Sequence, residues 1–177
     1  MREVLSRRSV HDGRIVKLWL ERVLLPNGRE TSLEVIEHPG ASTILPFIGP
    51  DEVVLIRQHR HCAGGSILEV PAGTLHPGES PEACALREVE EETGFRPGEL
   101  EPLGWIFTTP GFTDEKIWLF LATGLEATRQ RLENDELLTV EHVPLADAVG
   151  MALSGAIVDS KSVCALARAA RRLGVSR

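Results

Sequence analysis

The 177-residue sequence lacks the long apolar runs and the basic surplus that mark several large classes of protein. No apolar run approaches the roughly 18 residues that a membrane-spanning helix needs. The charged N-terminal segment is not followed by the apolar stretch of a secretory signal. We therefore expect a protein that neither crosses nor binds a membrane.

Cysteine is scarce, and the charge balance is acidic. The three cysteines, Cys62, Cys84 and Cys164, are widely spaced and form no CxxC pair. This pattern suits a reducing compartment, so we expect a cytoplasmic protein without a zinc site. The formal net charge is −7, from 26 acidic and 19 basic residues. Such a balance disfavours nucleic acid as a partner, because phosphate backbones call for a basic stripe.

The remaining composition is that of a folded chain. With 42% apolar and 25% charged residues, a chain of this length can bury a continuous core without disulfides. Helices are predicted between Ser80 and Gly94 and within residues 145–173, where a break falls near Gly155. Because helices and strands do not alternate strictly, a doubly wound sheet is not expected. Strands are predicted at residues 14–25, 31–37, 41–47, 52–58, 67–70, 104–108, 116–122 and 138–143.

The first two predicted strands are expected to form an N-terminal β-hairpin. They flank Pro26, Asn27 and Gly28, which together give a strong turn signal. We expect the chain to divide into residues 1–40, which contain the hairpin, and residues 41–177, which form the main domain.

The helix after Ser80 carries an unusual cluster of acids. At about 100° per residue, Glu88, Glu91 and Glu92 lie along one edge of the helix. Like charges at this spacing repel one another, so a cation is needed to compensate them. Arg87 can pair with Glu91, which leaves Glu88 and Glu92 for another cation. Carboxylates without neighbouring His or Cys suit Mg²⁺ or Mn²⁺ rather than zinc.

The spacing of these residues distinguishes the segment from an ordinary acidic helix face. Residues 73–95, GTLHPGESPEACALREVEEETGF, match the pattern Gx5Ex7REUxEExGU, in which U is a bulky apolar residue. A chance match is on the order of 10⁻⁸ per starting position at average residue frequencies. The segment resembles the box of the Nudix hydrolase family. The nine matching positions are Gly73, Glu79, Arg87, Glu88, Val89, Glu91, Glu92, Gly94 and Phe95.

The resemblance implies a fold, a reaction and a metal. The expected fold class is α/β (α+β), a Nudix-type α/β/α sandwich around a mixed β-sheet. The reaction would be hydrolysis of the pyrophosphate bond in a nucleoside diphosphate derivative, with Mg²⁺ (or Mn²⁺) as cofactor. Glu88, Glu92 and the carbonyl of Ala72 would be metal ligands, and Glu91 would support them through Arg87.

Three features outside the box resemble the ADP-ribose pyrophosphatase branch of the family. Pro110 lies sixteen positions after Gly94 and is followed by Gly111. Residues 56–73, IRQHRHCAGGSILEVPAG, resemble the RQxR…EVPAG stretch of that branch. The N-terminal hairpin resembles the region that is exchanged in its dimers, so a homodimer is expected. The implied substrate is ADP-ribose, cleaved to AMP and ribose 5-phosphate.

The same resemblance implies substrate contacts. Arg60 would contact the diphosphate, because its planar guanidinium can make bidentate bonds. Glu69 would hold the terminal ribose, and Pro110 and Gly111 would lie beside the substrate. Glu34 or Trp19 of a partner copy would line the adenosine pocket. Simpler interpretations also exist, namely a surface ion pair for Arg60, a core or interface position for Trp19, and an ordinary turn for Pro110–Gly111.

The general base is expected from the acidic segment Glu133–Asn134–Asp135–Glu136. Judged by its distance from the predicted strand at residues 138–143, Glu136 is the better match for the base. Glu133 is the second candidate. Asn134 occupies the position where some relatives carry the base, and an amide cannot abstract a proton.

Other activities remain open from the sequence. A related enzyme could act on GDP-mannose or another sugar nucleotide, or on FAD or NADH. A non-catalytic ADP-ribose-binding module usually loses box glutamates, and none is missing here. A purely structural acidic domain would not explain Arg87, Gly73 and Gly94.

Overall fold

The chain divides into two units, which we describe separately. The computed structural model describes residues 3–134 and 136–175. Unit 1 contains the described residues up to Gly40 together with Phe107–Lys116. Unit 2 contains Ala41–Ile106 and the described residues from Ile117 onward. The predicted division was residues 1–40 and 41–177, so the segment Phe107–Lys116 is the part that the sequence did not associate with the N-terminal region.

Unit 2 is built around a mixed β-sheet. The main order is β12-β5-β4-β10-β9, with β6 paired to β5 and β7 paired to β4. Strands β4 and β10 are parallel, whereas β12 and β5 are antiparallel. The strands are β4 (Ala41–Ile48), β5 (Glu52–Arg60), β6 (Gly65–Glu69), β7 (Ala72–Thr74), β9 (Glu99–Phe107), β10 (Lys116–Thr123) and β12 (Leu138–Pro144).

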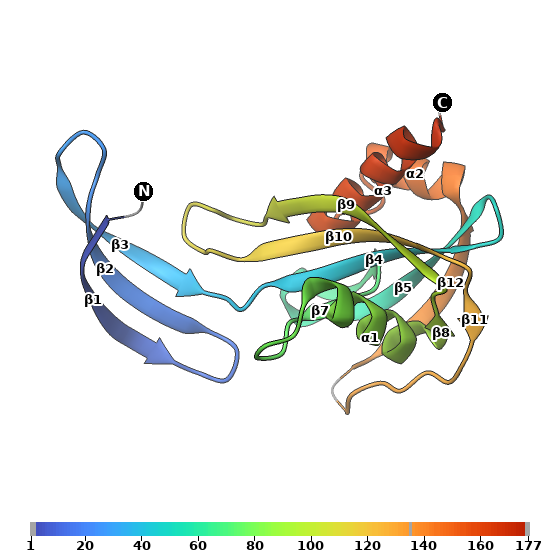
Figure 1. Cartoon of the computed structure of the whole chain (residues 1–177), viewed down its shortest axis with the longest axis horizontal. Coiled ribbons are helices and arrows are strands. Elements are labelled where there is room, and N and C mark those ends of the chain that lie inside the picture. The colour runs from blue at the N-terminus through green and yellow to red at the C-terminus, as the bar shows by residue number, and fades with distance from the viewer. Residues whose placement is uncertain (1–2, 135, 176–177) are drawn as a thin grey trace. The chain divides into compact units, whose positions relative to one another are not determined.

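Helices cover both faces of this sheet (Figure 1). They are α1 (Pro81–Thr93), α2 (Leu145–Ser154) and α3 (Ser160–Leu173). Successive residues of β4 point to opposite faces. Ile44 packs in a cluster with Val89 of α1, and Leu45 packs in another with Leu166 of α3. The predicted α/β/α sandwich is therefore confirmed.

Helix α1 begins and ends where the sequence predicts. The Ser80 side chain accepts a hydrogen bond from the amide of Ala83, and Pro81 occupies the first turn. Gly94 ends the helix with φ of 74°, a left-handed conformation that glycine adopts without steric cost. Its carbonyl accepts a hydrogen bond from the amide of Thr128. The ends of α1 are thus fixed both locally and by a distant loop.

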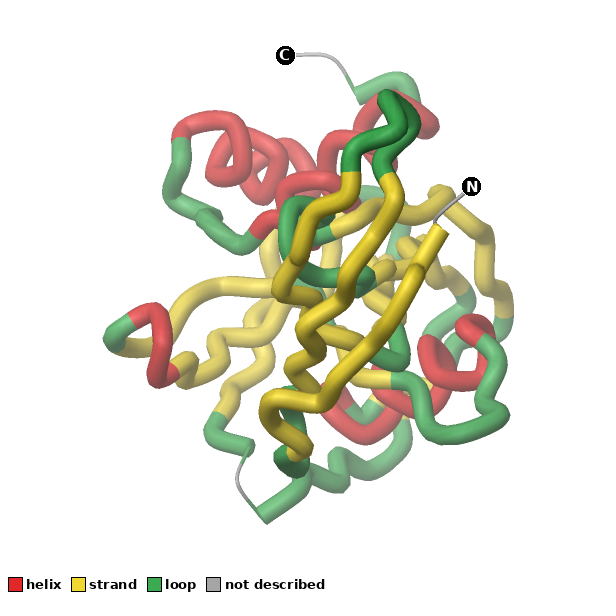
Figure 2. Tube along the Cα trace, turned by 90° about the vertical axis from the view of Figure 1, so that its left-hand side faces the viewer, coloured by secondary structure: helices red, strands yellow, loops and turns green. Residues whose placement is uncertain are grey.

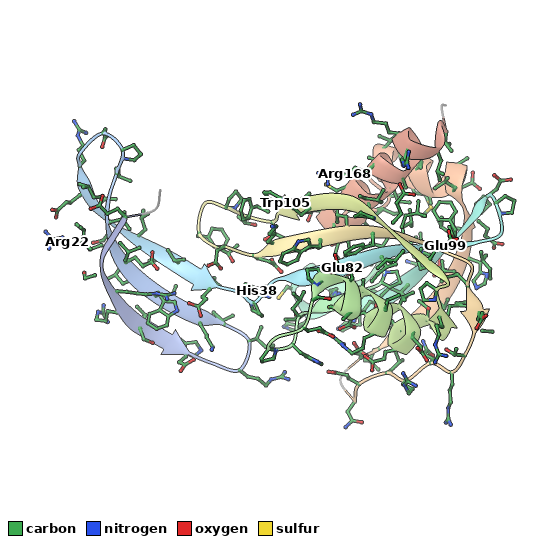
Figure 3. The ribbon with its side chains drawn as sticks, viewed as in Figure 1. Arg22, His38, Glu82, Glu99, Trp105 and Arg168 are labelled. Atoms are coloured by element: carbon green, nitrogen blue, oxygen red, sulfur yellow. The ribbon has the colours of Figure 1, made fainter. Side chains whose placement is uncertain are left out.

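The two C-terminal helices are separated at Gly155, as predicted, and α3 is tied to the sheet. Asp159 caps α3 by accepting a hydrogen bond from the amide of Ser162. Near the other end of α3, Arg168 donates to the carbonyls of Leu103 and Trp105 in β9 (Figure 3). No helix in the described part of the chain is long and apolar enough to cross a membrane.

Unit 1 is a three-stranded antiparallel sheet in the order β1-β2-β3 (Figure 2). The predicted hairpin corresponds to β2 (Lys17–Leu24) and β3 (Glu30–Glu37), and the structure adds β1 (Glu3–Asp12). All ten residues of β1 are exposed. A strand that buries neither face has no alternating apolar pattern, which explains why the sequence did not reveal it.

Three short elements complete the part of the chain that the structure describes. They are the 3₁₀ helix η1 (His61–Ala63) and the two-residue strands β8 (Phe95–Arg96) and β11 (Glu126–Ala127), which pair with each other. In unit 1, β3 is joined to the segment Phe107–Lys116 by the hydrogen bond from the amide of Ile36 to the carbonyl of Phe112, 2.7 Å long.

Candidate active site

Helix α1 and the loop before it bring three carboxylates around one guanidinium in unit 2. Arg87 donates from Nε and Nη2 to the two carboxylate oxygens of Glu79, at 2.9 and 3.0 Å. Its Nη1 lies 2.6 Å from Glu88 and 3.2 Å from Glu91. The predicted pair with Glu91 is therefore present, but Glu79 is the bidentate partner and Glu88 is bonded as well. A single cation thus links three of the box carboxylates.

The pairing of Arg87 with Glu79 stabilises the charged forms of both groups. The hydrogen bonds from Arg87, opposed by partial burial, lower the pKa of Glu79 to about 2. The pKa of Arg87 is raised, mainly by the same hydrogen bonds to Glu79. Glu79 also accepts a hydrogen bond from the amide of His76, which fixes the loop that enters α1. Glu79 and Arg87 therefore form an ionised pair at neutral pH, which links the loop before α1 to the helix.

Glu88 and Glu92 belong to the buried face of α1 and behave differently. Both are buried, and Glu92 is only 1% exposed. Burial raises the pKa of Glu88, although the charge of Arg87 opposes the effect. Burial, followed by the charge of Glu88, raises the pKa of Glu92 well above its ordinary value. Their negative charges are therefore incompletely compensated by the protein, which is the property expected of cation ligands.

Gly73 is required at its position by the Glu88 side chain. A Cβ atom at residue 73 would overlap the Glu88 carboxyl group. The reason for glycine here is space rather than backbone conformation, because Gly73 has no positive φ. The first glycine of the box thus makes room for a carboxylate that lies fifteen positions later in the sequence.

Strand β7 holds the backbone of Ala72 against Glu92. The amide of Ala72 donates to Oε2 of Glu92 at 2.9 Å. Residue 72 pairs with Thr43 of β4, so a central strand fixes this segment. The predicted ligand group, Glu88, Glu92 and the carbonyl of Ala72, therefore comes from two adjacent elements, α1 and β7.

The donors at this place fit a hard divalent ion. Among the described residues, no group of three or more His, Cys, Asp or Glu side chains is arranged to hold a metal by itself. Mg²⁺ commonly binds one or two carboxylates and completes its shell with water and substrate phosphates. Two buried carboxylates, a backbone carbonyl and the space provided by Gly73 match that requirement.

Glu90 is the one glutamate of the REVEEE run that faces elsewhere. The sequence places it on the side of the helix away from the acidic edge. In the structure it is half-buried and pairs with Arg96, whose Nη2 lies 3.0 Å from Oε1. This pair lies at the C-terminal end of α1 and contributes to the connection with β8.

A second charge cluster lies in unit 2 at Glu69, the last residue of β6. Arg60 donates from Nε and Nη2 to the two oxygens of Glu69, at 2.8 and 2.9 Å. Lys161, from the first turn of α3, pairs with Oε2 of Glu69 and lies 3.0 Å from Asp159. The simpler interpretation of Arg60 as part of an ion pair is thus observed, although its partner Glu69 is buried.

The opposing effects on Glu69 can be separated. Burial alone would raise its pKa, but the hydrogen bonds from Arg60 and the charge of Lys161 outweigh burial and lower it. Hydrogen bonding to Glu69 raises the pKa of Arg60, and the more distant charge of Glu92 also contributes. The carboxylate of Glu92 is therefore within electrostatic reach of this second cluster.

The candidate bases lie just before β12. Glu136 is half-buried, whereas Glu133 is exposed. The charge of Glu136 acts on both Glu88 and Glu92, and it contributes to the raised pKa of each. The side chain of Glu136 also accepts a hydrogen bond from the amide of Glu133, at 2.8 Å. Of the two candidates, Glu136 is the one whose charge acts on Glu88 and Glu92. Asp135, between them, lies outside the described residues.

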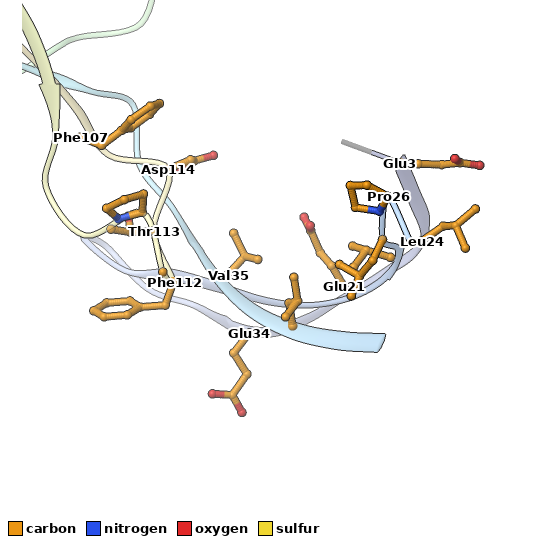
Figure 4. Close-up of a pocket in the computed structure, with 15 residues that line it drawn as sticks. Glu3, Glu21, Leu24, Pro26, Glu34, Val35, Phe107, Phe112, Thr113 and Asp114 are labelled. Carbon is orange, nitrogen blue, oxygen red and sulfur yellow. The ribbon is translucent and has the colours of Figure 1, made fainter. Parts of the chain in front are cut away.

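Unit 1 contains a cavity of about 360 Å³ that includes three of the predicted substrate contacts, Glu34, Pro110 and Gly111 (Figure 4). Pro110 and Gly111 form a turn in which the amide of Phe112 donates to the carbonyl of Thr109, 3.1 Å away. The turn interpretation and a position on a cavity wall are therefore compatible. The walls are otherwise mainly apolar side chains of β2 and β3.

Trp19 and Glu34 lie on opposite faces of the unit 1 sheet. Trp19 pairs with Val35 and Glu34 pairs with Leu20, so adjacent positions of β3 separate them. The Glu34 carboxylate points away from the cavity, whereas that of Glu21 points into it (Figure 4). Trp19 is half-buried, and the Arg7 guanidinium stacks over its ring at 3.8 Å from the centroid.

Two buried charged residues at these places were not anticipated from the sequence. Lys161 is separated from Glu69 by 92 positions and lies in a helix that carries no motif. Glu21 is 2% exposed in β2 and pairs with Arg7 at 3.2 Å. Glu21 lies at a position where the alternation of β2 calls for an inward-facing residue, between Trp19 and Val23. The alternation of β2 is the sequence signal that could have revealed Glu21. No sequence signal points to Lys161.

Known proteins resemble this chain over almost its whole length. An ADP-ribose pyrophosphatase of Bacillus subtilis (strain 168) is 35% identical over 166 residues, which cover 93% of this chain and 90% of the relative. A methanol dehydrogenase activator of Bacillus methanolicus is 37% identical with the same coverage. A crystal structure of an ADP compounds hydrolase superposes with a TM-score of 0.85 at 24% identity and covers 98% of this chain and 94% of its own.

The family profile described as NUDIX domain matches residues 37–166, which include the complete box, both charge clusters and the acidic segment before β12. Together with the carboxylates gathered on α1, this match shows that the chain belongs to the Nudix family.

Proposed function

We propose that this protein is a divalent-metal-dependent pyrophosphatase that hydrolyses ADP-ribose to AMP and ribose 5-phosphate. The observation that carries the proposal is the excess of buried negative charge on α1, where Glu92 contacts the amide of Ala72 and the Glu88 carboxylate lies against Gly73. The resemblance to the Bacillus subtilis ADP-ribose pyrophosphatase, which extends beyond the box, supports the choice of substrate.

Mg²⁺, or Mn²⁺, is the proposed cofactor, with Glu88, Glu92 and the Ala72 carbonyl as its protein ligands. A bound divalent ion would neutralise diphosphate oxygens and lower the pKa of a coordinated water. Glu91 supports the ligands indirectly through Arg87, which also holds Glu79 and Glu88.

Substrate contacts are proposed within each unit. In unit 2, Arg60 would bind the diphosphate, because its guanidinium is held along one edge by Glu69 while its side chain is 40% exposed. Glu69 would lie beside the terminal ribose. In unit 1, Pro110 and Gly111 line an apolar cavity that suits a flat ring such as adenine.

Glu136 is the proposed general base, and Glu133 is the alternative. Glu136 is favoured because its charge acts on both proposed metal ligands. Glu136→Gln should lower turnover by roughly a hundredfold or more, whereas Glu133→Gln should change it by less than about threefold. Full activity of both variants would move the role of base to another group.

We further propose a cytoplasmic homodimer formed through unit 1. The N-terminal sheet exposes apolar side chains, among them Val4, Leu5, Val10 and Leu33. Exposed apolar surface of this kind is commonly covered by a partner, and a second copy is the proposed one. Light scattering coupled to gel filtration should give a mass near twice 19.4 kDa. A monomer at micromolar concentration would contradict this part of the proposal.

The substrate assignment is tested by product analysis. The purified protein is incubated with Mg²⁺ and with ADP-ribose, GDP-mannose, FAD or NADH in parallel, and the products are separated by chromatography. ADP-ribose should give the highest kcat/KM, with AMP and ribose 5-phosphate as products. Faster cleavage of another member of the panel would replace ADP-ribose as the substrate and leave the pyrophosphatase reaction intact.

A further inference from the structure

Lys161 is one of three lysines in the chain, and it is buried beside the proposed substrate site. It comes from the first turn of α3, which no part of the box predicts. Its ammonium contacts one carboxylate oxygen of Glu69, and the two oxygens of Glu69 also hold Arg60. Lys161 is thus linked through Glu69 to Arg60, the proposed diphosphate ligand, and no role has yet been assigned to it.

The first turn of α3 is fastened to the segment that leads into the box. Ser162 accepts a hydrogen bond from the amide of Val70 at 2.8 Å. Asp159 caps the helix and lies 3.0 Å from Lys161. The Lys161 side chain is therefore held in the protein and does not extend into solvent, because its backbone and its ammonium are both fixed relative to Glu69.

The charges of this cluster balance only when Lys161 is counted. Arg60 and Lys161 are cationic, and Glu69 and Asp159 are anionic, so the four side chains sum to zero. Without Lys161 the sum would be −1, beside Glu88 and Glu92, which already repel an anionic diphosphate. Arg60 would then be the one cation left to neutralise Glu69, and less of its charge would act on a ligand.

Arg60 also retains hydrogen-bond donors that Glu69 does not use. Glu69 engages Nε and Nη2, and among the described residues no hydrogen bond uses Nη1. A guanidinium held along one edge presents its other edge in a fixed orientation, which favours bidentate recognition of phosphate oxygens. The holding carboxylate must itself be fixed, and Lys161 is the group that fixes its Oε2.

We propose that Lys161 is a positioning residue for diphosphate binding, which acts through Glu69 to orient Arg60 and to keep its charge available to the substrate. The inference rests on the proposed function, because it takes Arg60 as the diphosphate ligand. It adds a requirement in α3 that lies outside the box and outside the RQxR…EVPAG stretch.

The test compares Lys161→Met with Lys161→Arg, which preserves the charge. Lys161→Met should raise KM for ADP-ribose about tenfold with kcat changed less than about threefold, since a contact made equally in ground and transition state is weakened. Lys161→Arg should keep KM within about threefold of the wild-type value. Should Lys161→Met fail to fold, Lys161→Gln, which retains a hydrogen-bond donor without the charge, replaces it.

Arg57→Met is the matched control. Arg57 is on the same strand as Arg60, points to the opposite face and forms an exposed pair with Glu141. Its replacement by Met removes one positive charge, as Lys161→Met does. KM should stay within about twofold of the wild-type value. This result would show that the effect of Lys161→Met depends on where the charge is lost and not on the change in net charge.

Metal binding gives a readout that simple damage to the site would not reproduce. The positive charge of Lys161 acts on Glu92, so its removal should leave Mn²⁺ binding to the substrate-free protein unchanged or about twofold tighter. Binding is measured by calorimetry with Mn²⁺ alone. Weaker Mn²⁺ binding together with a higher KM would mean that the site has collapsed, and would overturn a positioning role.

Arg60→Met distinguishes failure of this inference from failure of the proposed function. A raised KM in Arg60→Met and a wild-type KM in Lys161→Met would overturn the role of Lys161 and leave Arg60 as the ligand. A wild-type KM in Arg60→Met would remove the proposed diphosphate contact itself.

Discussion

Two charge clusters lie in unit 2, and their difference indicates where a metal ion is needed. The box cluster contains four carboxylates and one cation, Arg87, which bonds to Glu79, Glu88 and Glu91 but not to the buried Glu92. The cluster at Glu69 pairs two acids with two bases and needs no further charge. The formal charges of the first cluster sum to −3, from four carboxylates and one arginine. Those of the second sum to zero. The first cluster is therefore the one in which an added cation would be stabilising.

Glu92 and Glu69 make the comparison sharper. Each is 1% exposed, so burial alone would raise the pKa of both carboxyl groups. The pKa of Glu92 is raised well above its ordinary value by burial and by Glu88. Burial acts in the same direction on Glu69, but Arg60 and Lys161 outweigh it and the pKa is lowered. The two cations beside Glu69, which Glu92 lacks, therefore account for the lowered pKa of Glu69.

The largest expected effect is on catalysis at Glu92. Glu92→Gln should lower turnover by roughly a hundredfold or more, because a metal-held charge is lost. The change is followed by steady-state hydrolysis of ADP-ribose at saturating Mg²⁺. Exposed Glu82→Gln, on the same helix, is the control and should retain wild-type turnover. Near-wild-type turnover of Glu92→Gln would contradict the metal site.

The same substitution should destabilise the protein in one cluster and not in the other. Glu69→Gln leaves Arg60 and Lys161 without their shared carboxylate and should destabilise the fold by about 2 kcal/mol. Glu92→Gln removes an uncompensated buried charge and should leave the metal-free protein as stable or more stable. Denaturant unfolding without divalent ions measures both. Equal destabilisation of the two variants would remove the distinction between the clusters.

A smaller effect is expected at Gly73. Gly73→Ala should displace the Glu88 carboxylate, since the added methyl group would overlap it. Activity should fall about tenfold and Mn²⁺ binding should weaken, while the melting temperature changes little. Gly78→Ala, in the same loop, is a comparison with open space around the new methyl group but a positive φ. Wild-type Mn²⁺ affinity of Gly73→Ala would show that the Glu88 side chain can adopt another conformation that still binds the metal ion.

The smallest expected effect is the pH dependence of stability without metal. Since burial raises the pKa of Glu88 and Glu92 in the folded state, their ionisation costs stability above about pH 4.5, and lowering the pH towards that value should stabilise the protein. Glu79 has the opposite sign, because its pKa is lowered to about 2, so its contribution is lost between pH 4.5 and 2. Thermal unfolding at a series of pH values, with and without Mg²⁺, measures this. Stability that falls steadily from pH 7 to pH 5 without metal would contradict the raised pKa values.

The sequence predicts what depends on neighbouring residues. Ser80 and Gly94 fix the ends of α1, and helical spacing alone places Glu88 and Glu92 on one edge. The requirement for Gly73 follows from the motif, but its physical cause, the position of the Glu88 carboxylate, emerges once β7 and α1 are seen packed together.

What the sequence could not predict depends on distant contacts. Lys161 and Glu69 meet because α3 packs beside β6, and no local pattern records that contact. Strand β1 is exposed throughout and lacks an apolar alternation. The segment Phe107–Lys116 belongs to unit 1 through its bond to Ile36, although it is far from the N-terminus in sequence.

The central claim is that the buried carboxylates of α1 hold a divalent ion for cleavage of a diphosphate. Calorimetric titration of the purified protein with Mn²⁺, paired with ADP-ribose hydrolysis over the same metal concentrations, tests it most directly. Binding and hydrolysis should rise together, and Glu92→Gln should weaken metal binding and lower hydrolysis by roughly a hundredfold or more. A protein that takes up neither Mg²⁺ nor Mn²⁺ and cleaves no nucleoside diphosphate derivative would contradict the account.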